Sequence, residues 1–113
     1  MKFEINNQHW EIIRHNTKRL KEIVSKIQGE ELDFVYGYTY YPTQKILINS
    51  DLTIEQQLFS LRHELTHCYI WCCGLCHVDF NDCEIVSDIV ASSNDFINKT
   101  ILKYEDWIKK EDK

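Results

Sequence analysis

Glycine and proline are scarce in this chain of 113 residues, which has three glycines and one proline. No repeat, low-complexity stretch or flexible linker divides it, so we expect a single domain over residues 1–113. No apolar run approaches the roughly 18 residues of a membrane-spanning helix. The first residues also lack the apolar core of a secretory signal. These absences predict a cytoplasmic protein without a membrane partner.

A basic surface is also missing. The chain has 13 Lys and Arg against 18 Asp and Glu, which gives a formal net charge of −5. Lys18-Arg19 and Lys109-Lys110 are isolated pairs and not parts of a basic run. Because nucleic-acid binding depends on positive surface charge, this composition argues against a nucleic-acid partner.

The hydrophobic pattern predicts an α+β domain. A first helix is expected from about Asn7 to Ile27, because apolar residues recur there at helical spacing. Residues 34–41 and 45–49 are rich in aromatic and β-branched residues and predict a β-hairpin. Further helices are expected at about 53–72 and 83–98, with a short final helix at 101–108. The helices would pack on a small antiparallel sheet.

The segment His63-Glu64-Leu65-Thr66-His67 is the most informative feature of the sequence. Two histidines four positions apart lie on one face of an α-helix, because four residues make slightly more than one turn. Both imidazoles could then bind one Zn²⁺ at the usual distance of about 2.0–2.1 Å. Glu64 would accept a proton from a zinc-bound water as the general base. The motif predicts a zinc metallopeptidase.

A catalytic zinc also needs a third protein ligand and an open position for water. Glu84 is the predicted third ligand, 17 positions after His67 and early in the next helix. Asp88 would share its helical face and accept a hydrogen bond from a zinc histidine. His77, ten positions after His67, is the competing ligand. Glu84 is preferred because Asp88 accompanies it.

Together the two segments resemble a gluzincin, the zincin class whose third ligand is a glutamate on the helix after the motif helix. Glu84-Ile85-Val86-Ser87-Asp88 matches the Glu-x-x-Ser-Asp pattern of thermolysin-like members. The size and element order are similar to minimal gluzincins and to ImmA/IrrE-type peptidase domains, which are common in phages and mobile elements. The resemblance covers about residues 47–96.

This resemblance implies a minimal zincin-like fold in which the active-site helix precedes the glutamate helix. It implies zinc ligation by His63, His67 and Glu84, and an orienting role for Asp88 towards His63. The substrate would pair with an edge strand, which we expect at Lys45–Asn49. A developing oxyanion would need a further donor, for which Tyr69, His77 and the tyrosines of the hairpin are candidates.

Five cysteines lie within 16 positions, an odd number that does not suggest a disulfide framework in a reducing compartment. Cys68, Cys72 and Cys83 are expected to be small core residues, with the other two cysteines in a loop. The alternative is a second, structural zinc site with four ligands: Cys73, Cys76, His77 and Cys83.

The sequence therefore predicts a zinc-dependent endopeptidase that acts on a protein or peptide substrate. One alternative is a catalytically latent or inactive zincin-fold protein that serves a phage or mobile element in binding or regulation. A second alternative is a SprT-like protease that uses His77 as the third ligand. A third is a purely structural zinc with four protein ligands.

Overall fold

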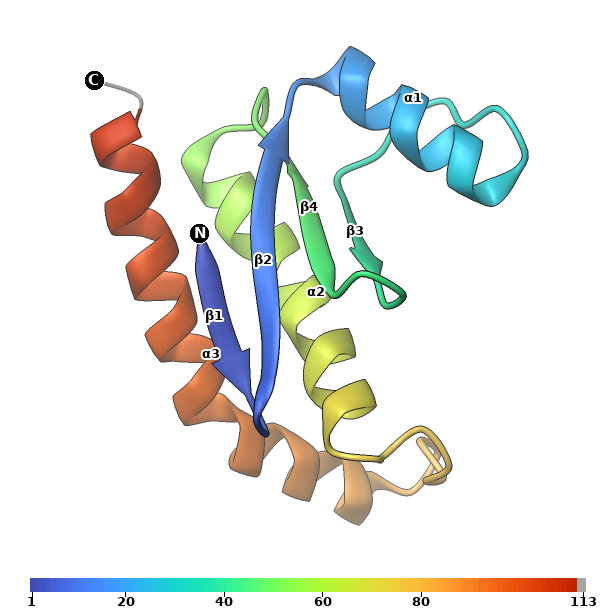
Figure 1. Ribbon diagram of the computed structural model, residues 1–113. Helices are drawn as coiled ribbons and strands as arrows, with labels where there is room; N and C mark the ends of the chain where they lie inside the picture. Colours follow the sequence, from blue (N-terminus) through green and yellow to red (C-terminus); the bar gives the residue numbers. More distant parts are fainter. Residues whose placement is uncertain (112–113) are drawn as a thin grey trace.

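The computed structural model describes residues 1–111 as a four-stranded mixed sheet with three helices (Figure 1). The predicted α+β class is confirmed. None of the helices in these residues is long and apolar enough to cross a membrane. The elements in chain order are β1 (Lys2–Ile5), β2 (Gln8–His15), α1 (Thr17–Gln28), β3 (Gly37–Tyr40), β4 (Lys45–Asn49), α2 (Ile54–Cys72) and α3 (Cys83–Glu111).

The strand order across the sheet is β1-β2-β4-β3. The predicted hairpin is confirmed, since β3 and β4 pair antiparallel. The expected purely antiparallel sheet is wrong, because β2 pairs with β4 in parallel. The expected edge strand at Lys45–Asn49 is also wrong: β4 is paired on both sides, so its backbone has no free edge. The edge beside β4 is β3.

The predicted helix from Asn7 to Ile27 is wrong in its first half. Residues 8–15 form β2, in which Trp10 and Ile12 are buried two positions apart, as in a strand. Asn6 and Asn7 have φ angles of 48° and 62° and make the tight turn between β1 and β2. The helix begins only after Asn16, whose side chain caps α1 by accepting a hydrogen bond from the backbone of Arg19.

The alternation of side chains places helices on both faces of the sheet. Ile12, Ile46 and Ile48 belong to the cluster that α2 and α3 cover. Leu47 points the other way and packs with Leu20 of α1. The central strand β4 is therefore buried on both sides, which explains its continuous apolar sequence.

Helix α2 carries the segment His63–His67 and lies beside both β3 and β4 (Figure 1). It begins with a capping box in which Thr53 and Gln56 exchange side chain–backbone hydrogen bonds. Leu61, Leu65 and Cys68 are fully buried and hold one face of α2 on the core. A different face is left exposed, and it carries His63 and His67.

The predicted two C-terminal helices form one continuous helix, α3, of 29 residues. The separation expected near residue 99 does not occur, because neither glycine nor proline interrupts residues 83–111. Asp82 caps this helix by accepting a hydrogen bond from the backbone of Glu84 at 2.9 Å. Helix α3 packs antiparallel to α2 through hydrogen bonds between Arg62 and Asn98 and between Tyr69 and Ser92.

Candidate metal centre

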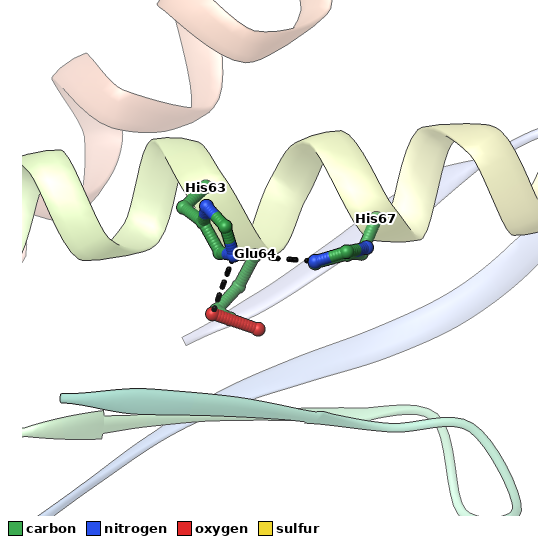
Figure 2. A group of neighbouring side chains, drawn as sticks. All are labelled: His63, Glu64 and His67. Atoms are coloured by element: carbon green, nitrogen blue, oxygen red, sulfur yellow. Dashed lines mark hydrogen bonds and ion pairs between the residues drawn. The ribbon is translucent and has the colours of Figure 1, made fainter. Parts of the chain in front are cut away.

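Three polar side chains project from the same side of α2 towards the β3–β4 hairpin: His63, Glu64 and His67 (Figure 2). Each offers one ligand atom, and these atoms all lie within 4.8 Å of one another. Within residues 1–111, no other group of three or more His, Cys, Asp or Glu side chains is close enough to hold a metal ion. The helical placement predicted for this motif is confirmed.

The spacing of the two imidazoles suits a zinc ion. The Nε2 atoms of His63 and His67 are 3.2 Å apart. Two nitrogens bound to one tetrahedral zinc at about 2.0–2.1 Å would be about 3.3 Å apart, so little adjustment is required. The His63 side chain is 64 % exposed, so water or a third ligand can approach from the solvent side.

Glu64 lies beneath the histidines and is held by the sheet. Its side chain is only 11 % exposed, and Thr39 of β3 donates a hydrogen bond to Oε1 at 2.9 Å. Its other oxygen, Oε2, lies 4.0 Å from Nε2 of His63. A buried carboxylate is costly unless polar groups accompany it, and Thr39 supplies one such group. One oxygen is therefore fixed while the other faces the histidine pair.

A glycine allows β3 to approach Glu64 closely. A Cβ atom added at Gly37 would lie 3.1 Å from the carbonyl oxygen of Leu47 and 3.3 Å from Cγ of Glu64. Both separations are tighter than ordinary van der Waals contact. Sequence reasoning missed Thr39 and Gly37, because their roles depend on how β3 sits against α2.

A tyrosine of the hairpin, Tyr41, packs on α2 and is influenced electrostatically by Glu64. Burial raises the pKa of Tyr41, and negative charge on Cys76 or Glu64 would raise it further. The hydroxyl of Tyr41 therefore stays protonated at neutral pH and can donate a hydrogen bond. Its ring packs against Trp71 of α2, with the ring centroids 4.7 Å apart.

The structure does not bring Glu84 or Asp88 to the histidines. Both are exposed in the first turns of α3, and neither belongs to the group of possible metal ligands. Ser92 is level with Tyr69, and Glu84 lies eight residues earlier, about 12 Å further along the helix axis. Because α2 and α3 are antiparallel, that direction leads away from His67. The assignment of Glu84 as third ligand stays a prediction that requires the start of α3 to move.

The two other predicted side chains also lie outside the group. His77 is exposed in the segment that joins α2 to α3. Tyr69 faces α3, where its hydroxyl donates a hydrogen bond to Ser92 at 2.9 Å. His77 is not among the possible ligands around His63 and His67.

The cysteines divide into a buried pair and an exposed set. Cys68 and Cys72 are buried, as predicted, and burial strongly raises the pKa of the Cys68 thiol. The prediction that Cys83 is a core residue is wrong, because it lies exposed at the start of α3. The described residues contain no cluster of the four ligands considered for a second zinc: Cys73, Cys76, His77 and Cys83.

No protein-family model, curated protein or solved structure matched this chain in the comparisons.

The predicted third ligand can be tested by comparing the zinc affinities of two variants with that of the wild type. We expect Glu84→Gln to weaken zinc binding by at least about 10-fold, a loss comparable with removal of an outer-shell partner. His77→Gln should leave the affinity unchanged. Competition with a chromogenic chelator measures both dissociation constants. The reverse ranking would favour His77, and two unchanged affinities would mean that neither side chain binds the ion.

Proposed function

We propose that this protein is a zinc-dependent peptidase of the gluzincin type. The observation that carries the proposal is the 3.2 Å separation of the Nε2 atoms of His63 and His67, with the carboxylate of Glu64 beside them. The pair suits one tetrahedral ion, and the exposed side of the pair leaves room for a substrate. The motif spacing and the resemblance to gluzincins support the same activity.

The side chains of this group have complementary tasks in peptide hydrolysis. His63 and His67 would hold the zinc ion, which supplies Lewis acidity that makes water more acidic and polarises a carbonyl. Glu64 accepts the proton of the attacking water on Oε2, while Thr39 keeps Oε1 in place. Glu64 then transfers this proton to the nitrogen of the leaving amine. The protonated hydroxyl of Tyr41 is a candidate donor to the developing oxyanion.

The free edge of β3 is a suitable place for the substrate backbone. Strand β3 is one of the two edge strands of the sheet and contributes Thr39 to the site. An extended peptide that added to this edge would form main-chain hydrogen bonds and run past Glu64. Such pairing favours an endopeptidase, because recognition through the backbone does not require a chain terminus.

Digestion of a degenerate peptide library tests this function. The zinc-loaded protein should cleave internal peptide bonds, a chelator should abolish cleavage, and added Zn²⁺ should restore it. Mass spectrometry identifies the products, and elemental analysis gives the zinc content. Zinc binding with no cleavage of any library member would refute the peptidase and favour a structural or regulatory ion.

A further inference from the structure

The hydrogen-bonding pattern of the β3–β4 hairpin leaves two residues of β3 facing the free edge of the sheet. The backbone N–H of Asn49 donates a hydrogen bond to the carbonyl oxygen of Tyr36 at 3.0 Å. These two residues lie directly opposite each other, one step beyond the Gly37–Ile48 pair. Hydrogen-bonded and non-hydrogen-bonded pairs alternate along an antiparallel ladder. The N–H and C=O groups of Gly37 and Thr39 therefore point away from β4, towards the free edge.

The same two residues contact the proposed general base on the inner face of the sheet. Positions 37 and 39 share one face, because alternate residues of a strand do. Thr39 is 8 % exposed, and its hydroxyl donates a hydrogen bond to Oε1 of Glu64 at 2.9 Å. The other acceptor within reach, the backbone carbonyl oxygen of Glu64, is further away at 3.3 Å. A carboxylate accepts a stronger hydrogen bond than a neutral carbonyl, so the hydroxyl proton lies on Oε1.

Position 37 explains why the hydroxyl can reach the carboxylate. A Cβ atom added at Gly37 would lie 3.2 Å from Cδ1 of Ile48 and 3.3 Å from Cγ of Glu64, so any side chain there would push β3 away from α2. Glycine at this position keeps β3 close to α2, and Thr39 follows only two residues later on the same face. The backbone at the free edge and the carboxylate of Glu64 are thus joined through one residue.

We propose that Thr39 is a positioning residue that couples pairing of the substrate backbone with β3 to the orientation of Glu64. The proposal rests on the peptidase function proposed above. The backbone of Thr39 meets the substrate, and its hydroxyl holds Oε1, which directs Oε2 to the water that Glu64 deprotonates. A strand added at the free edge fixes the backbone of Thr39 from its second side. Part of the binding energy of a long substrate then aligns the base and raises kcat.

Substrate length provides the first test. We compare a short blocked peptide with a longer one that contains the same cleaved bond. The longer peptide should raise kcat of the wild type by about 10-fold, an effect equivalent to one or two main-chain hydrogen bonds. Thr39→Val should lower kcat for the longer peptide by about 10- to 100-fold, leave KM nearly unchanged and abolish the gain with length. Thr39→Ser, which keeps the hydroxyl, should restore most of the activity.

Thr100→Val is the matched control for this change. Thr100 is also buried, at 5 % exposure, but its hydroxyl donates to the backbone carbonyl oxygen of Phe96 within α3. Its replacement should leave kcat and the dependence on length unchanged. Equal losses in Thr39→Val and Thr100→Val, or no gain with length in the wild type, would overturn the proposed coupling while cleavage itself still supported the peptidase.

The contact between Thr39 and the carboxylate can be tested without zinc and without cleavage. Thr39→Val should lower the urea midpoint of the metal-free protein more in the wild type than in a Glu64→Met background. Methionine favours helices and removes the carboxylate, but it leaves the backbone carbonyl of residue 64 as an acceptor. The difference between the two losses therefore reports the Thr39–carboxylate pair alone.

Equal losses of the midpoint would show that the hydroxyl serves only the backbone carbonyl, and they would overturn the positioning role. This result is distinguishable from failure of the peptidase function, because the unfolding measurement requires no activity and the library digestion tests cleavage separately. A larger loss in the wild type, together with the kcat effect of Thr39→Val and its rescue by Thr39→Ser, would support the proposal.

Discussion

Replacement of Glu64 by glutamine should lower kcat for peptide cleavage by about 10²- to 10⁴-fold, the usual contribution of a general base. Glutamine is close in size and can still accept a hydrogen bond from Thr39 on its carbonyl oxygen, so the local structure should persist. It cannot, however, take a proton from water. Steady-state kinetics on a cleaved library peptide gives kcat and KM separately.

Zinc content distinguishes loss of the base from loss of the ion. Glu64→Gln should retain one equivalent of zinc, because the imidazoles of His63 and His67 are unchanged. Glu105→Gln is the control for the chemical change itself, since Glu105 forms an ion pair with Lys109 on α3. If Glu64→Gln cleaves peptides as fast as the wild type while carrying zinc, Glu64 is not the base.

Replacement of His67 by alanine should weaken zinc binding by more than about 100-fold, beyond the usual effect of an outer-shell partner. His63 and the predicted third ligand would leave the ion with only two protein ligands, fewer than a catalytic zinc site has. Because His67 is exposed and alanine favours helices, the variant should fold without loss of α2. Competition with a chromogenic chelator measures the affinity, and peptide cleavage should fall to background.

The linkage between zinc binding and folding supplies a second readout for His67→Ala. Free zinc at 100 times its dissociation constant should raise the free energy of unfolding of the wild type by about 2.7 kcal/mol. The same zinc concentration should leave the variant almost unchanged. His9→Ala is the matched control, because His9 is 83 % exposed on β2 and remote from the motif in sequence. A variant that keeps the full zinc-induced stabilisation would exclude His67 as a ligand.

Local patterns were sufficient to predict α2 and its motif. The cap at Thr53, the buried residues Leu61 and Leu65 and the four-residue spacing of the histidines all act within one helix. The β3–β4 hairpin could also be predicted from the sequence, because its two apolar runs are separated by a short turn.

In contrast, residues 8–15 carry apolar side chains that fit helical spacing and strand alternation alike, and the prediction of a helix there was wrong. Asn6-Asn7 and Asn16 were the available signals for a turn and a later helix start.

The sequence by itself determined that two imidazoles and a carboxylate lie on one side of a helix, because helical geometry alone sets their spacing. Only the tertiary structure decided what surrounds them. The packing of β3 against α2 gave Glu64 its partner Thr39, and the packing of α1 and residues 32–38 against α2 formed an apolar pocket that His63 and Glu64 help to line. The antiparallel packing of α3 left Glu84 beyond the end of α2. These relations join residues far apart along the chain, and their distances follow from sheet order and helix packing and not from local sequence spacing.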